Sequence, residues 1–346
     1  MSQRVKRKHE SLLALKPLKG VNYQPSPSDY RSLPPPSTYF DSDFTNQDFI
    51  GLWGPNGNRI QKGRNDILTI KRSLHSNVIK MFNWNPSRNH QSFLDYCQQN
   101  DLKVIIPISN YFVLNVSQQQ SNIINIIKQG QHPSVIAFSI GNELSMSNTQ
   151  NIARVFQLVV KNDGGNRSVC SPIKQNDFPS LPAEIQKNCH SLGLFSQFDN
   201  LFFQAINVYP PPKNVVNGAL DNLKLVVNSQ WPHSQFASQP LLITEYGWNS
   251  ATTSFINQGA SIGSQARFIS ENSKDPNKPL FLGGVLFEFS DELWKPDEGG
   301  GYDGDSYGLY TFADQFTNDS TTTNQSYRID QLSPKDAFIT YKNNIR

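Results

Sequence analysis

Two glutamates stand at the ends of two strongly apolar segments. Glu143 follows residues 134–142, which read Ser-Val-Ile-Ala-Phe-Ser-Ile-Gly-Asn, and Glu245 follows Pro-Leu-Leu-Ile-Thr at residues 240–244. Holding a carboxylate partly buried at the end of an apolar strand costs free energy, and such residues are often found at catalytic sites. If both strands belong to one parallel barrel, the two carboxylates lie on the same rim. Glycoside hydrolysis uses such a pair, one group as proton donor and the other as nucleophile or base.

Each of these residues has a functional and a structural interpretation. Glu143 would be the general acid/base, with a pKa raised by partial burial, although a carboxylate at a helix N-terminus is the alternative. Glu245 would be the nucleophile, held by the hydroxyl of Tyr209. Asn142 could donate to a sugar hydroxyl. An interior aromatic ring and a turn-forming amide are the structural alternatives for Tyr209 and Asn142.

Three tryptophans, Trp84, Trp248 and Trp294, lie at or just beyond predicted strand ends. Their flat faces could stack on sugar rings, and packing is the alternative for each of them. Residues 297–305 are rich in Asp and Gly, but their order does not fit a calcium loop. The six histidines are scattered without an H-x-H or H-E-x-x-H pattern. We therefore predict no metal and no cofactor.

Apolar strands alternate with amphipathic helices along the chain, which is typical of parallel βαβ units. Glu143 and Glu245 are 102 residues apart. That interval fits three units of a barrel in which about 250 residues make eight units, so the glutamates fall on strands four and seven. A doubly wound open sheet is the alternative, but its glycine-rich phosphate turn is absent. We predict a single-domain α/β (β/α)8 TIM barrel with strands at residues 18–24, 77–84, 102–108, 134–143, 168–171, 201–209, 240–248 and 280–289.

The predicted domain comprises residues 17–346, with long loops at 25–65, 172–200 and 295–330, and it follows a basic disordered tail at 1–16. The tail could alternatively be a nuclear address. No signal peptide and no apolar run of membrane-spanning length are recognisable. The expected location is therefore cytoplasmic or nuclear.

Composition excludes several classes of protein. The chain is 37% hydrophobic and 17% charged, as in a globular protein, and its net charge of +3 is too weak to indicate a nucleic-acid partner. Three cysteines are too few for a disulfide scaffold. Cys170 and Cys189 could bridge a loop, and reduced buried thiols are the alternative.

The Gly-Asn-Glu143 and Thr-Glu245-Tyr-Gly motifs together resemble the retaining glycoside hydrolases of clan A, which are (β/α)8 barrels. The segment Lys-Gly-Val-Asn-Tyr-Gln-Pro at residues 19–25 is most similar to the family 72 β-1,3-glucanosyltransferases, with the family 17 β-1,3-glucanases second. This resemblance implies that Glu143 is the acid/base and Glu245 the nucleophile, that Asn142 and Tyr209 support them, and that Gln24 contacts substrate.

The chain departs from this family pattern at two places. Residues 80–82 read Lys-Met-Phe where such enzymes often have Arg-Val-Tyr, which removes a bidentate donor and a hydroxyl. Residues 287–292 on the eighth strand read Phe-Glu-Phe-Ser-Asp-Glu and contain no tyrosine. These changes concern the substrate and the choice between hydrolysis and transfer, which both stay open.

The predicted function is a retaining β-glycoside hydrolase or transglycosylase that acts on a β-linked glucan, with β-1,3-glucan favoured. The partner is an oligo- or polysaccharide, and retention requires carboxylates roughly 5 Å apart. A catalytically silent glycan-binding barrel is the alternative from another class. A third possibility is an interaction or packaging protein that uses the basic tail. The oligomeric state stays open.

Overall fold

The computed structural model describes residues 9–27, 42–45, 64, 66–209, 218–251, 254–292, 306–316 and 330–346. Trp294, the Asp- and Gly-rich residues 297–305 and tail residues 1–8 lie outside these ranges, as do most of the predicted loops 25–65 and 295–330. Within the described part, no helix is both long enough and apolar enough to cross a membrane.

A sheet of nine parallel strands forms the centre of the molecule, in the order β5-β4-β3-β2-β1-β9-β8-β7-β6. The first strand, β1, pairs with β2 on one side and with β9 on the other. Strands β5 and β6 are separated by two residues and together take the place of one strand. A bridge from Val169 in β5 to Phe202 closes the ring. The strands are β1 (Leu18–Asn22), β2 (Val78–Lys80), β3 (Lys103–Ile108), β4 (Val135–Ile140), β5 (Ser168–Cys170), β6 (Ile173–Lys174), β7 (Gln204–Val208), β8 (Leu241–Tyr246) and β9 (Phe281–Leu286).

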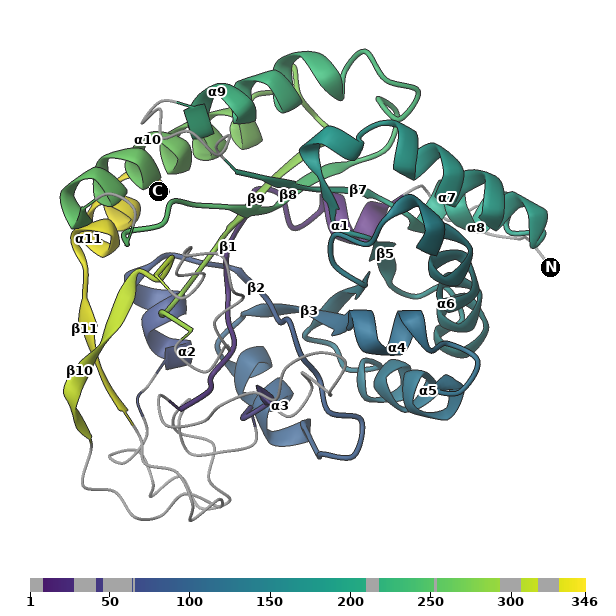
Figure 1. The fold of residues 1–346 in the computed structure, drawn as a ribbon, viewed down its shortest axis with the longest axis horizontal. Coiled ribbons are helices and arrows are strands. Elements are labelled where there is room, and N and C mark those ends of the chain that lie inside the picture. The colour runs from purple at the N-terminus through teal and green to yellow at the C-terminus, as the bar shows by residue number, and fades with distance from the viewer. Residues whose placement is uncertain are drawn as a thin grey trace.

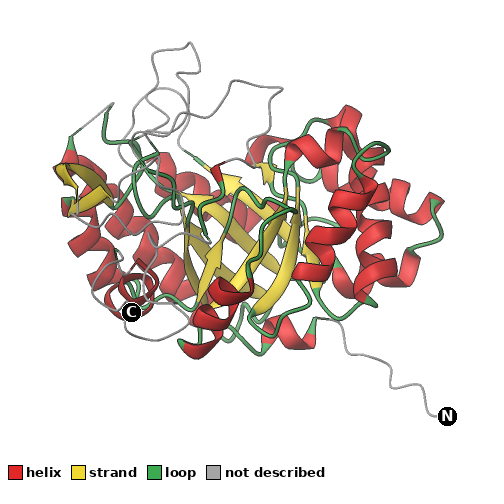
Figure 2. Ribbon diagram, turned by 90° about the horizontal axis from the view of Figure 1, so that it is seen from below, coloured by secondary structure: helices red, strands yellow, loops and turns green. Residues whose placement is uncertain are grey.

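Helices surround the strands on the outside, as Figures 1 and 2 show. Their apolar residues recur at helical spacing. Helix α6 (Thr149–Asp163), for example, buries Ile152, Phe156 and Val159 on one face, and this face packs on the sheet. The arrangement confirms the predicted (β/α)8 barrel. The main helices are α2 (Asp66–Leu68), α3 (Gln91–Gln99), α4 (Asn110–Leu114), α5 (Gln120–Gln129), α6 (Thr149–Asp163), α9 (Gly218–Leu225) and α10 (Phe255–Lys274).

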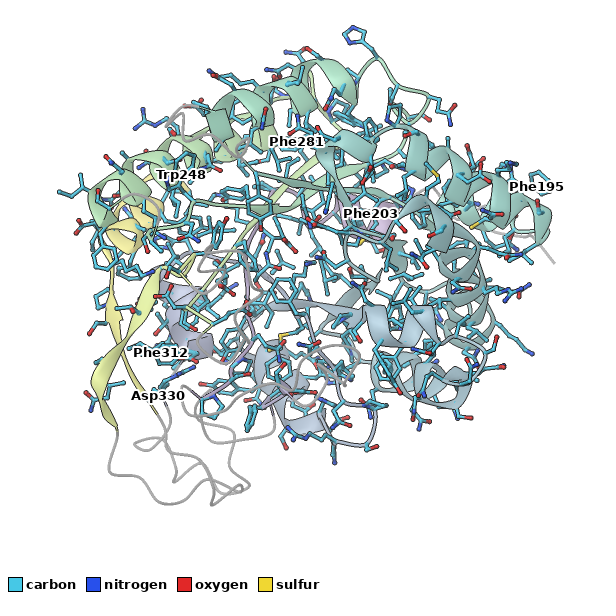
Figure 3. The ribbon with its side chains drawn as sticks, viewed as in Figure 1. Phe195, Phe203, Trp248, Phe281, Phe312 and Asp330 are labelled. Atoms are coloured by element: carbon cyan, nitrogen blue, oxygen red, sulfur yellow. The ribbon has the colours of Figure 1, made fainter. Side chains whose placement is uncertain are left out.

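The barrel interior has an apolar amino-terminal end that a short helix, α1 (Glu10–Leu13), covers. Leu12 of α1 is buried in a cluster with Leu18 and Val78 of the barrel strands and with Phe203, which directly precedes β7. Phe203 lies near the middle of the molecule, whereas Phe195 lies at its outer edge (Figure 3). Residues 9–16 are therefore a packed segment, and the predicted disordered tail is corrected at these positions.

Two predicted loops contain regular structure. Residues 172–200 hold β6, α7 (Ser180–Ser191) and most of α8 (Phe195–Leu201), because Leu181, Ile185 and Cys189 give α7 an apolar face. The described end of residues 295–330 enters an antiparallel hairpin of β10 (Tyr310–Phe316) and β11 (Asp330–Pro334). A final helix, α11 (Asp336–Asn344), packs on α10 beside this hairpin (Figure 1).

All three cysteines are unpaired and buried in the structure, so the Cys170–Cys189 bridge does not form. Burial raises the pKa of Cys170 to about 12, which keeps this thiol protonated and unreactive. The alternative of reduced buried thiols therefore holds.

Candidate active site

A cleft of about 510 Å³ opens at the carboxyl-terminal end of the barrel. Both predicted catalytic glutamates, Glu143 and Glu245, line it, together with Asn142 and Tyr209. This is the end at which (β/α)8 enzymes build their sites, because the loops that follow each strand converge there. The assignment of the glutamates to the fourth and seventh barrel strands is confirmed by the strand order.

Glu245 enters the cleft because strand β8 is irregular just before it. Ile206 of β7 pairs with Ile243, but the next residue, Asn207, pairs with Glu245, so β8 holds one extra residue there. A bulge of this kind re-aims the side chain that follows it. The side chains of Thr244 and Glu245 consequently both point inward, as their hydrogen bonds show.

The carboxylate of Glu245 is buried and has two donors. The ammonium group of Lys80 lies 3.0 Å from Oε1, and the hydroxyl of Tyr209 donates to Oε2 over 2.8 Å. Burial, followed by the nearby Glu245 charge, raises the pKa of Tyr209 well above its ordinary value, so its hydroxyl remains a donor. A cation and a hydroxyl are the partners of an ionised carboxylate.

The backbone at Glu143 is held from three directions. Gly141 N–H donates to Ile108 O, Asn142 N–H to the side chain of Asn110, and Glu143 N–H to Pro172 O. Glu143 itself has φ +54°, in the left-handed region that non-glycine residues adopt rarely. Such a conformation costs free energy and persists where the surroundings fix it, which is common at functional sites.

The side chain of Glu143 is less enclosed than that of Glu245. It is 26% exposed; Asn207 Nδ2 donates to Oε1 over 3.0 Å, and Lys174 Nζ lies 3.7 Å from Oε2. Burial raises the pKa of Glu143, and the negative charge of Glu245 raises it further. The Asn207 hydrogen bond and the two lysines offset part of that rise. The two carboxyl groups of the cleft therefore lie in different environments.

Lys80 and Asn207 were not among the predicted site residues, although the sequence contains a signal for both. Lys80 is a lysine inside an otherwise apolar strand, two positions after the inward-facing Val78. Asn207 lies on β7 two positions before Tyr209, which directly follows the strand, and at this spacing the two side chains share a side. Lys80 also donates to Asn22, whose own amide donates to the backbone of β8 and β9.

An aromatic wall closes one side of the cleft. The ring of Phe287 lies edge-on to those of Phe82, Tyr209 and Tyr307, with centroids 5.2–6.2 Å apart. Phe82 and Phe287 line the cleft, and the Lys80 ammonium lies 4.3 Å from the Phe82 ring centre. Phe82 and Phe287 thus give the described lining of the cleft an aromatic surface.

Two of the predicted binding residues, Trp84 and Trp248, lie away from the cleft lining. Trp84 is buried, stacks on His90 and donates to Gln129. Trp248 lies beside α10 (Figure 3), where Gln258 donates to its carbonyl oxygen. In both cases packing, rather than a sugar platform, is what the structure shows.

Gln24 is buried beneath the rim of the cleft. Its Oε1 accepts from the backbone N–H groups of Phe82 and Asn83, and its Nε2 donates to Ser42 O. Both ends of the amide are therefore used within the protein. Gln24 fixes the loop after β2 instead of facing the cavity. Trp294 lies outside the described residues.

Across the described ranges, no group of three or more His, Cys, Asp or Glu side chains could hold a metal ion. The groups that the cleft offers are carboxylates, ammonium groups, amides and a phenol. They can donate and accept protons and form an ester with an electrophilic carbon.

Comparison with known proteins shows where this architecture recurs. No family model and no curated protein matches the sequence. A β-glucuronidase from Ruminococcus gnavus in complex with D-glucuronic acid superposes with a TM-score of 0.56 at 15% identity, over 82% of this chain and 45% of that chain. A structure from a study of two plant β-glucan endohydrolases with distinct substrate specificities superposes with a TM-score of 0.51 at 13% identity, over 71% of this chain and 91% of that one.

The chain spans less than half the length of the β-glucuronidase chains that it resembles. At these identities the likeness concerns the fold. This chain, which has two carboxylates in the cleft of its barrel, therefore shares its fold with a β-glucuronidase and a plant β-glucan endohydrolase.

Proposed function

We propose that this protein is a retaining β-glycosidase or transglycosylase that acts on a β-linked glucan, with β-1,3-glucan favoured. The observation that supports it most directly is the pair of unlike glutamates in one cleft, Glu143 and Glu245. Two titratable groups whose surroundings differ in this way can divide the roles of acid and nucleophile between them.

The role of Glu143 follows from its raised pKa and partial exposure. A protonated carboxyl group can donate to the glycosidic oxygen as the bond to the anomeric carbon breaks, and the leaving sugar departs as an alcohol. Glu245 then forms an ester to the anomeric carbon from the opposite side. Lys80 and Tyr209 hold its two oxygens in position for that attack.

The second half of the reaction reverses these roles. Glu143, now ionised, takes a proton from water or from a sugar hydroxyl, whose oxygen attacks the anomeric carbon and releases Glu245. Water gives hydrolysis, and a sugar acceptor gives a longer glycan. In either case two inversions at one carbon retain the β configuration.

The choice of a glucan rests on the resemblance of the motifs and on one neighbour. The plant structure belongs to β-glucan endohydrolases and shares the barrel over 91% of its length. The β-glucuronidase shares the barrel too, and its complex contains D-glucuronic acid. A uronide therefore belongs beside neutral glucans among the substrates to be tested.

The test is a time course by proton NMR of the purified protein with β-1,3-gluco-oligosaccharides, with β-1,4-linked and uronide substrates in parallel. We expect the first product to carry a β-anomeric proton, or products longer than the substrate to form. Glu245→Gln should abolish both. It removes the nucleophilic charge and preserves the shape of the side chain.

An α-anomer as first product would mean inversion and would overturn the double-displacement mechanism. A Glu245→Gln protein as active as the wild type would remove Glu245 from the role of nucleophile. Binding of oligosaccharide by both proteins, without turnover by either, would instead establish a silent glycan-binding barrel.

A further inference from the structure

We propose that Asn207 is a positioning residue of this site, whose amide ties Glu143 to the strand of Glu245 and leaves Oε2 of Glu143 as the oxygen that carries the transferable proton. The inference rests on the proposed function for its catalytic meaning. Its structural content, the control of one carboxyl group by one amide, can be measured without turnover.

Three hydrogen bonds place the Asn207 amide. The hydroxyl of Thr244 donates to Asn207 Oδ1 over 2.8 Å, and Asn207 Nδ2 donates to Glu143 Oε1 over 3.0 Å and to Asn142 Oδ1 over 3.2 Å. Asn207 is buried, and the register pairs it with Glu245 across β7 and β8. One side chain therefore connects the residue before Glu245 with the other glutamate and its neighbour.

The orientation of this amide determines what Glu143 can do. Because the Thr244 hydroxyl occupies the amide oxygen, the NH₂ group faces Glu143 and Asn142 and uses both of its hydrogens. Oε1 already accepts a hydrogen bond from Asn207, which makes it the less favourable oxygen for the carboxyl proton. The proposal therefore places the proton on Oε2, whose charged neighbour is the exposed Lys174 ammonium at 3.7 Å.

The same contact affects the energetics of Glu143. A hydrogen bond from a neutral donor favours the ionised carboxylate, and the Asn207 contact lowers the pKa of Glu143 against the larger effect of burial. Removal of the amide should therefore raise the pKa of Glu143 further. It should also let the carboxyl group rotate, and loss of alignment lowers the rate of proton transfer.

The experiment compares Asn207→Leu with a matched control, Gln204→Leu. Both residues are buried amides on β7, but Gln204 lies at the other end of the strand, where it donates to Gln239. Thr244→Val removes the hydroxyl that orients the amide and leaves Asn207 itself in place. Thr244→Ser is its control, because serine keeps that hydroxyl.

The first readout is the pKa of Glu143, from a pH titration of protein labelled with ¹³C at the glutamate carboxyl carbons. The Glu143 signal is identified by its loss in Glu143→Gln. We expect a higher pKa than wild type in Asn207→Leu, a smaller rise in Thr244→Val, and values close to wild type in Thr244→Ser and Gln204→Leu.

The second readout is the pH profile of kcat/KM. We expect the alkaline limb of Asn207→Leu to move to higher pH, kcat to fall by about 10²-fold, and KM to change little. A Glu143 pKa in Asn207→Leu equal to that of the wild type would overturn the inference, as would an equal rise in Gln204→Leu. If Asn207→Leu does not fold, Thr244→Val against Thr244→Ser decides by the same criterion.

The two proposals fail in different ways. If the wild type cleaves no glycan, the proposed function fails, and the titration still decides whether Asn207 controls Glu143. If the wild type cleaves glycans and the titration shows no difference, the function stands and the inference about Asn207 fails.

Discussion

At the amino-terminal end of the barrel the strands face a layer of aliphatic and aromatic side chains, whereas at the carboxyl-terminal end they face amides, carboxylates and a buried ammonium group. The change occurs within two residues on several strands. An apolar inward residue is followed two positions later by a polar one in the pairs Val78/Lys80, Ala137/Ser139, Ala205/Asn207 and Leu242/Thr244. Since side chains alternate across a strand, one short strand can supply both packing and chemistry.

The two ends also differ in how they are closed. Helix α1 covers the apolar end with Leu12, whereas the polar end opens into the cleft. Charged groups can be held at the open end because they pair with one another, as Lys80 and Glu245 do. One end therefore packs the barrel and the other holds the groups of the proposed chemistry, so substitutions at the two ends should have different effects.

The largest effect on activity is expected for Glu143→Gln. Without a proton donor, kcat/KM for an unactivated glycan should fall by about 10²- to 10⁴-fold. An aryl glycoside with an acidic phenol needs no protonation of its leaving group, so its cleavage should fall far less. Steady-state kinetics on both substrates test this, and an equal loss on both would remove Glu143 from the role of acid.

Lys80→Met tests the buried cation of the cleft, and its effect is to be compared with that of the exposed Lys174. Loss of the ammonium leaves Glu245 buried beside an apolar group, and kcat should fall by about 10²- to 10³-fold. Unfolding in denaturant should show a loss of about 3–5 kcal/mol at neutral pH.

Lys174→Met is the matched control for that prediction. Lys174 is 61% exposed and lies 3.7 Å from Glu143, so water screens its charge and the loss in kcat should be much smaller. Equal losses for the two lysines would show that burial is not what gives Lys80 its effect.

Leu12→Ala tests the apolar end. Truncation of this buried side chain should lower the free energy of unfolding by about 2–5 kcal/mol and leave kcat/KM of the folded protein unchanged. Leu13→Ala, at a partly buried neighbour, should cost less. A Leu12→Ala protein with unchanged stability would show that α1 does not contribute to the closure of the barrel.

The smallest effect concerns pH and stability. Burial, with the charge of Glu245, raises the pKa of Glu143 in the folded protein, so the folded state binds more protons there than the unfolded state. The stability that Glu143 gains from binding this proton is fully present below the pKa of Glu143 in the unfolded chain. It is lost as the pH rises through the higher pKa of Glu143 in the folded protein.

As the pH is raised between these two pKa values, the free energy of unfolding should fall less for Glu143→Gln than for the wild type, because glutamine does not titrate. Denaturant unfolding of both proteins, measured at steps from acidic to neutral pH, checks the difference in slope. Parallel stability curves would contradict a raised pKa of Glu143.

Much of the fold was predictable from local pattern. Apolar, β-branched runs such as residues 102–108 and 134–140 form β3 and β4 close to where the sequence places them. A helix at residues 182–189 was predictable from the spacing of its apolar residues, and α7 extends it by a few residues at each end. Helix α1 was not predicted, because it is too short for a local signal and is held by what it packs against. Leu12 is buried only because the barrel has an open apolar end.

The sequence predicted that both glutamates and Tyr209 lie in the candidate site, and the cleft contains all three. Its predictions for the other binding residues were less accurate. Gln24, Trp84 and Trp248 stand beside strand ends in the sequence, but the structure uses them within the protein interior. Whether a residue near a strand end faces the cleft or the packed shell depends on the register, on bulges and on neighbouring loops, none of which a linear pattern contains.

The sequence by itself determined the number and order of the barrel strands and the two glutamates that end strands four and seven, because strand and helix periodicity are local properties of the chain. Only the tertiary structure decided that Lys80 and Asn207 meet those glutamates. Lys80 is 165 residues from Glu245 and Asn207 is 64 residues from Glu143. Contacts over such separations exist only after the barrel closes and its inward-facing residues are brought to one axis.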